Sequence, residues 1–146
     1  IKNCIVVLNR TAFLKQLPKG GYAAEIGVEH GMFSKEIIEI VKPEKLDLVD
    51  WWLNKQDLQQ IKKNVEGNNS VNFQRQKSTK YIANQPEKSL DWVYIDTDYT
   101  YNTTKIELEL ARLALKPHGL ICGHDYTSIS YTGLRKYGVV EAVNEF

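Results

Sequence analysis

Residues 22–31 read YAAEIGVEHG, an apolar run that ends in a turn with two glycines. The run from Tyr22 to Val28 predicts a short buried strand, and the apolar spacing after it predicts a helix that starts near Phe33. Gly27 allows a backbone bend that a side chain would hinder, and Gly31 lets the chain pass close to a ligand or to a facing strand. The first N–H groups of the helix point into the same space, which is typical of a nucleotide-cofactor site. The same pattern also occurs in many α/β folds without a ligand, so the downstream residues have to decide.

The rest of the chain continues this alternation of strand and helix. Further strands are predicted at 46–50, 71–73, 90–95 and 120–123, and helices at 33–41, 58–65, 100–115 and from Thr132 onward, with an exit loop at 74–80 and a short helix after the third strand. Such alternation predicts an α/β, doubly wound, mainly parallel sheet with helices on both faces. We expect residues 1–21 to form a lid or lead-in segment, with a short helix at 11–17, and residues 22–146 to form the main domain.

Composition limits the classes of function. The chain has 146 residues, of which 42% are hydrophobic and 25% are charged, and its net charge is +1. We therefore expect one globular domain, with no nucleic-acid partner and no membrane association. The two cysteines indicate reduced thiols in a cytoplasmic protein, with a disulfide as the minority alternative. Because the sequence begins at Ile1 and ends at Phe146 inside a predicted helix, we expect an excised or trimmed domain.

Polar residues gather where the predicted strands end. Glu25 lies within the first strand, Asp50 ends the second, Asp96 ends the fourth, and His124 and Asp125 follow the fifth. Because parallel strands place their carboxyl ends at one edge of the sheet, these side chains are expected to line one rim, where ligands bind in open α/β sheets.

Two of these acids have individual interpretations. Asp50 follows Gly27 by roughly twenty residues, the position at which an acid accepts hydrogen bonds from the ribose hydroxyls of a nucleoside cofactor. The alternative is a helix cap or a solvated loop acid. Glu25 is costly within a strand unless it is paired, so it is expected to meet a cation or several donors. The alternative interpretation of Glu25 is a core residue whose carboxylate is fully hydrogen-bonded.

The glycine turn lacks the pattern of a dinucleotide site. Such a site has a second glycine two residues after the first, whereas this chain has Glu29 there, and an acid would repel a pyrophosphate. NAD is therefore disfavoured, and a cofactor with a ribose and an amino-acid moiety but no phosphate fits better.

Four segments together resemble the class I S-adenosylmethionine-dependent methyltransferases, in particular the branch that acts on small molecules and sugars. They are EIGVEHG at 25–31, LDLVDWW at 46–52, DWVYIDTDYTY at 91–101 and LALKPHGLICGHDY at 113–126. The resemblance covers roughly residues 22–146 and implies a Rossmann-like methyltransferase fold. The family sheet normally has two more strands after the last helix, and this chain is too short for them. An exposed sheet edge would then invite a partner, with a homodimer as one option.

The resemblance also implies roles for individual residues. Glu25, Gly27 and Gly31 would surround the methionine part of the cofactor, Asp50 would hold the ribose, Trp51 would pack by the adenine, and Ser78 would approach the adenine edge. Trp51 could instead be a core residue, and Ser78 an ordinary loop residue.

In several relatives the acids after the fourth and fifth strands bind a divalent cation. The matching residues here are Asp96 and Asp125, which have the oxygen ligands that Mg²⁺ prefers. Alternatively, Asp96 bonds the cofactor's amino group and Asp125 caps the next segment. The usual histidine of the fourth-strand motif is replaced by Tyr99, and tyrosine is a poor base at neutral pH. We therefore expect His124 to act as the general base, with Asp96 as the second catalytic candidate.

These observations lead to one principal hypothesis and two alternatives. The principal hypothesis is O-methylation of a small hydroxylated molecule or sugar, with S-adenosylmethionine and with or without Mg²⁺. The first alternative is a non-catalytic nucleoside-cofactor-binding module of a larger protein, and the second is an NAD-dependent oxidoreductase.

Overall fold

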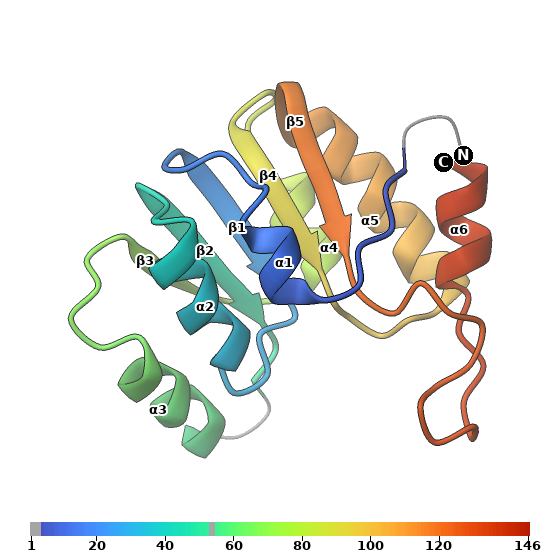
Figure 1. Cartoon of the computed structure of the whole chain (residues 1–146), viewed down its shortest axis with the longest axis horizontal. Coiled ribbons are helices and arrows are strands. Elements are labelled where there is room, and N and C mark those ends of the chain that lie inside the picture. The colour runs from blue at the N-terminus through green and yellow to red at the C-terminus, as the bar shows by residue number, and fades with distance from the viewer. Residues whose placement is uncertain (1–3, 53–54) are drawn as a thin grey trace.

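The computed structural model describes residues 4–52 and 55–146 and contains a single sheet in the order β3-β2-β1-β4-β5, with all strand pairs parallel (Figure 1). The strands are β1 (Tyr22–Ile26), β2 (Lys45–Asp50), β3 (Val71–Arg75), β4 (Leu90–Ile95) and β5 (Leu115–Gly123). The helices are α1 (Arg10–Leu14), α2 (Met32–Ile40), α3 (Lys55–Asn64), α4 (Ser78–Ala83), α5 (Tyr101–Ala114) and α6 (Val139–Glu145). Residues 1–3 of the predicted lid segment lie outside the described residues.

Helices cover both faces of the sheet (Figure 1). One core layer joins β1 through Ala23 to the helices α1 and α2, which contribute Leu14 and Ile37. The next strand residue, Ala24, faces the opposite layer, where Tyr81 of α4 is buried. Because neighbouring strand residues serve opposite layers, the short apolar runs of the sequence are buried on both sides. The predicted doubly wound α/β fold is confirmed.

Several predicted boundaries were wrong, three of them with consequences for the loops. The segment 74–80 is no continuous loop, because β3 extends to Arg75 and α4 begins at Ser78. The fifth strand begins at Leu115, five residues earlier than predicted. The last helix begins at Val139, not at Thr132. Residues 128–137 form a turn instead, in which the Ser130 N–H donates to the Arg135 carbonyl and Gly133 has a φ of 73°.

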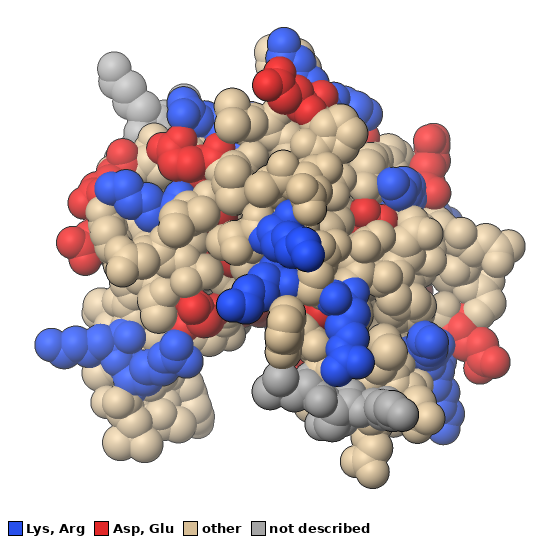
Figure 2. Space-filling view, turned by 180° about the vertical axis from the view of Figure 1, so that it is seen from behind, with Lys and Arg blue, Asp and Glu red and all other residues tan. Residues whose placement is uncertain are grey.

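On the side that α4 and α5 cover, acidic and basic side chains are mixed, and neither sign of charge dominates the face that Figure 2 shows. Within 4–52 and 55–146, no helix combines the length and the apolar character needed to cross a membrane.

A buried polar network joins β1, β2 and α4. Asp47 of β2 is 2% exposed, and its Oδ2 atom accepts hydrogen bonds from the Tyr22 and Tyr81 hydroxyls at 2.6 and 2.7 Å. The Asn72 amide donates to the other carboxylate oxygen at 3.1 Å. Three donors therefore satisfy this buried acid, so the network serves the fold and has no need of a ligand.

The ends of β1 and β4 approach each other unusually closely at Gly27. A Cβ atom at this position would lie 1.7 Å from the Asp96 carbonyl oxygen, and the φ of Gly27 is +87°. The Gly27 N–H donates to the Val49 carbonyl at 2.9 Å, so the same residue is also tied to the end of β2. A side chain here would push apart the strand ends that carry Glu25, Asp50 and Asp96.

Replacing Gly27 by alanine is therefore expected to destabilise the chain by about 4 kcal/mol or more, because a backbone atom blocks the new methyl group. Gly67→Ala is the matched control. Gly67 has a φ of +79°, but its Cβ would meet nothing within 4 Å, so only the backbone cost of about 1–2 kcal/mol remains. Urea unfolding followed by circular dichroism measures both. Equal losses in the two variants would contradict the close approach of the strand ends.

Candidate active site

The structure brings the acids of β1, β2 and β4 together at the carboxyl ends of the strands. Asp96 and Asp50 are close enough to Glu25 for their negative charges to raise its pKa. The turn that contains Gly27 lies between the ends of β2 and β4, since it contacts the Asp96 carbonyl and bonds to Val49. The predicted rim therefore exists as one region of the molecule.

Asp50 holds the rim loops in place. Its Oδ2 atom accepts the N–H groups of Val28 and Glu29 at 2.8 and 2.9 Å. Its Oδ1 atom accepts those of Trp51 and Trp52 at 2.5 and 3.1 Å. A carboxylate has about four lone-pair sites, so these four amides use its whole accepting capacity. In this state Asp50 shapes the turns after β1 and β2.

Glu25 is buried with few partners. Its side chain is 1% exposed, and its Oε2 atom accepts one hydrogen bond, from the Ser34 hydroxyl of α2 at 2.6 Å. Burial raises the pKa of Glu25 to about 8, because neither Ser34 nor the nearby Arg10 offsets the lost solvation. The cost predicted for an acid in this strand is real, and the chain meets it by keeping the carboxyl protonated at neutral pH.

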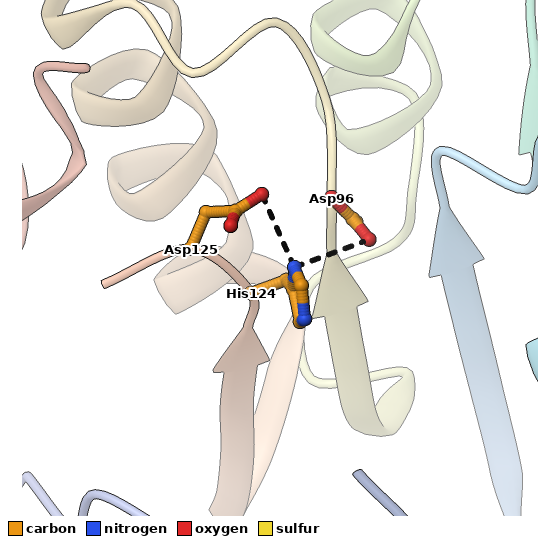
Figure 3. Close-up of side chains that lie close together, drawn as sticks. All are labelled: Asp96, His124 and Asp125. Atoms are coloured by element: carbon orange, nitrogen blue, oxygen red, sulfur yellow. Dashed lines mark ion pairs between the residues drawn. The ribbon is translucent and has the colours of Figure 1, made fainter. Parts of the chain in front are cut away.

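A second cluster at the rim joins β4 and β5. The His124 Nδ1 atom lies 3.1 Å from Asp125 Oδ2 and 3.9 Å from Asp96 Oδ2, between the two carboxylates (Figure 3). Burial raises the pKa of Asp96, although the Tyr99 hydroxyl and His124 act to lower it. The other ring nitrogen of His124 points away from both acids (Figure 3). This arrangement leaves one imidazole nitrogen available to exchange a proton with a ligand.

Tyr99 acts as a donor in this cluster. Its hydroxyl donates to Asp96 Oδ1 at 2.9 Å, and its ring stacks on Tyr137 with 4.5 Å between the centroids. Burial and then the Asp96 charge raise the pKa of Tyr99 above its ordinary value. Both findings support the prediction that this residue is a poor general base.

The cluster of Asp96, His124 and Asp125 could hold a cation, since one ligand atom from each lies within 4.8 Å of the others. The donor set nevertheless fits Mg²⁺ poorly. One of its three ligands is an imidazole nitrogen, whereas Mg²⁺ prefers oxygen ligands. Both oxygens of Asp96 are also engaged, one by Tyr99 and the other by His124 and the Arg10 guanidinium at 3.8 Å. These three side chains therefore do not form a suitable Mg²⁺ site.

Three predicted cofactor residues lie outside these two clusters. Gly31 is the N-cap residue of α2 with a φ of 75°, and a Cβ there would lie 3.1 Å from the Ile61 side chain. Trp51 is half-exposed on the loop after β2, with the Lys77 ammonium 5.9 Å from its ring centroid. Ser78 is the first residue of α4, not a loop residue, and its hydroxyl acts on the buried carboxyl of Glu107.

Strained backbone gathers in the same loops. The four loops that follow β1, β2, β4 and β5 each contain a non-glycine residue with positive φ, namely Glu29 at 52°, Trp52 at 33°, Tyr99 at 63° and Asp125 at 53°. Such conformations are costly and cluster at functional sites, where the surrounding structure enforces them.

The sequence analysis missed two residues of the rim, Arg10 and Tyr94. Arg10 begins α1, and its guanidinium reaches Asp96 and lies 4.8 Å from the centroid of the Phe33 ring. Tyr94 pairs with Glu25 in the sheet, and its hydroxyl is buried beside Arg10. No local pattern marks Arg10, because its place depends on how α1 docks against α2.

Replacing Glu25 by glutamine is expected to change how stability depends on pH. The folded chain keeps the Glu25 proton up to about pH 8, whereas the ordinary pKa is 4.5. The contribution of the protonated Glu25 to the free energy of unfolding is complete below pH 4.5. It is lost as the pH rises through 8, by on the order of 1 kcal/mol per pH unit. Glu25→Gln should therefore match the parent near pH 5 and exceed its stability at pH 8.5, as measured by urea unfolding. Exposed Glu66→Gln serves as the control, and an offset that does not vary with pH would contradict a protonated Glu25.

Comparison with known proteins places this geometry in a family. Residues 24–126 match the methyltransferase domain family. No curated protein matches the chain significantly. Among solved structures, the N-methyltransferase NodS from Bradyrhizobium japonicum has a TM-score of 0.69 at 11% identity, over 92% of this chain and 77% of that chain. Precorrin-6y C5,15-methyltransferase from Geobacter metallireducens has a TM-score of 0.68 at 17% identity, over 92% and 67%.

Precorrin 8w decarboxylase from Methanobacterium thermoautotrophicum has a similar fold, with a TM-score of 0.59 at 16% identity over 75% of this chain. This chain spans 56% of the decarboxylase, just over half. At such identities the structures establish the fold alone, whereas the family match covers most of the sequence. The chain therefore belongs to the methyltransferase domain family, in agreement with the resemblance of its motifs to class I S-adenosylmethionine-dependent methyltransferases.

Proposed function

We propose that this chain transfers the methyl group of S-adenosylmethionine to a hydroxyl group of a small molecule, such as a sugar. The observation that carries the proposal is the His124 imidazole, whose Nδ1 faces Asp125 and Asp96 while its other nitrogen points away from both acids (Figure 3). A hydroxyl acceptor has to lose a proton as it is methylated, so a positioned base at this rim favours oxygen as the accepting atom.

The rim offers polar groups that suit the cofactor. The residues that would hold it are Glu25, Gly27, Gly31, Asp50, Trp51, Ser78 and Asp96. Among residues 4–52 and 55–146, Glu25 is buried with a single hydrogen-bond donor, so it gains from a polar ligand. Because Asp50 already accepts four amides, it would hold ribose hydroxyls only by exchanging backbone bonds for them.

The protein has three tasks in this reaction: to align the acceptor, to exclude water and to remove one proton. When bound, S-adenosylmethionine supplies a methyl group that its sulfonium has already activated. The free nitrogen of His124 takes the hydroxyl proton, and the carboxylates of Asp125 and Asp96 stabilise the imidazolium that results. Tyr99 donates to Asp96 and thereby fixes the carboxylate that faces the base.

Replacing His124 by asparagine is expected to lower kcat by about 10²- to 10⁴-fold, the range for the loss of a general base. Cofactor affinity should remain within twofold, because His124 acts on the acceptor. His118→Asn is the matched control, since His118 is an exposed histidine of β5, the same strand that positions His124. The assay follows labelled methyl transfer to a panel of hydroxylated small molecules, including sugars.

Calorimetric titration of the parent chain with S-adenosylmethionine and with NAD separates the other hypotheses. Binding of S-adenosylmethionine without turnover on any acceptor would favour a non-catalytic module. Binding of NAD alone would favour an oxidoreductase. A fully active His124→Asn variant would show that His124 is not the general base.

A further inference from the structure

Arg10 is placed at the rim by the packing of the N-terminal segment. The Asn9 side chain caps α1 by accepting the Ala12 N–H at 2.8 Å, and Leu14 is fully buried in the core. The Thr11 hydroxyl donates to Glu36 of α2 at 2.7 Å. These contacts fix the helix on both of its sides, so the guanidinium of its first residue has a defined position over the end of β4.

The surroundings of Arg10 are acidic and incompletely paired. Its charge acts to lower the pKa of Glu25, Asp96 and Tyr94, so the guanidinium lies close to all three. The contact with Asp96 Oδ2 is 3.8 Å, which is longer than a hydrogen bond, and the guanidinium is close enough to the Tyr94 hydroxyl for hydrogen bonding to act on the pKa of that phenol. A guanidinium has five N–H donors, so some remain for a ligand beside the buried Glu25 and the partly exposed Asp96.

The orientation of Arg10 suits a planar anion. One contact of the guanidinium is with the Phe33 ring, at 4.8 Å from the centroid, and about 46% of the Arg10 side chain is exposed. The planar fork of an arginine matches a carboxylate with two parallel hydrogen bonds. A ligand that brings a carboxylate to Arg10 would bring a neighbouring positive group toward Glu25 and Asp96.

We propose that Arg10 binds the carboxylate of the amino-acid end of the cofactor, with Glu25 and Asp96 facing the ammonium group of the same moiety. This inference rests on the proposed function, because S-adenosylmethionine supplies both charges on one carbon. It assigns the N-terminal segment a binding role, because Arg10 of α1 would recognise the amino-acid end of the cofactor.

Two ligands test the assignment. S-Adenosylhomocysteine carries the amino-acid end, and 5′-methylthioadenosine has the same nucleoside without it. Arg10→Ala is expected to raise the Kd for S-adenosylhomocysteine by about 10- to 100-fold and to leave the Kd for 5′-methylthioadenosine within twofold of the parent value. Arg10→Lys should recover part of the loss, since it keeps the charge but not the fork. Arg112→Ala, which removes an exposed arginine of α5, is the control.

The outcomes separate this inference from the proposed function. If the parent binds S-adenosylhomocysteine and Arg10→Ala binds it equally well, the assignment of Arg10 is wrong and the proposed function stands. If Arg10→Ala weakens both ligands equally while its thermal unfolding is unchanged, Arg10 does not recognise the amino-acid end. If the parent binds neither ligand, the proposed function fails, and the assignment fails with it. Loss confined to S-adenosylhomocysteine in a folded variant supports the assignment.

Discussion

The close approach of Gly27 to the Asp96 carbonyl is the constraint on which the rest of the site depends. It brings the turn after β1 against the end of β4, while the Gly27 N–H ties the same turn to β2. The Asp50 carboxylate then accepts hydrogen bonds from backbone N–H groups of the turns after β1 and β2. Three strand ends are thereby locked together by backbone contacts. Asp50 is therefore part of the frame itself, whereas the side chains of His124 and Asp125 are placed on it.

The electrostatics of the rim follow from this crowding. The charges of Asp96 and Asp50 act to raise the pKa of Glu25, and Arg10 acts to lower it. Arg10 and His124 both act to lower the pKa of Asp96. For Glu25, lost hydration outweighs its hydrogen bond and the nearby guanidinium, so the free chain keeps a proton there. A positively charged ligand would reverse that balance, because it would favour the ionised carboxyl.

The sequence analysis predicted the architecture well because the fold depends on regular patterns. Apolar runs at strand spacing and at helical spacing predicted every strand of the described chain and the order of the layers. The acids at strand ends were also predictable, since parallel strands end at one edge. The start of the last helix was not, because the turn at Gly133 depends on bonds between Ser130 and Arg135 that no short-range pattern reveals.

The site was predictable only in part, for a related reason. Asp96, His124 and Asp125 follow strands that pair in the sheet, so their meeting could be inferred from topology. Arg10 reaches the rim through the docking of α1 on α2, a contact between distant segments. Tyr94 has the sequence pattern of an ordinary strand residue. The burial of its hydroxyl beside Arg10 depends on contacts between distant segments, which the sequence does not show.

The Asp47 network has a practical consequence. Tyr81 is 1% exposed and donates to a buried carboxylate, so burial first, and then its neighbours, raise the pKa of its phenol. Phenolate absorbs ultraviolet light differently from phenol, and the raised pKa favours the phenol form of this side chain in the folded chain at alkaline pH. The chain thus carries an intrinsic chromophore that reports the integrity of its own interior without any added dye.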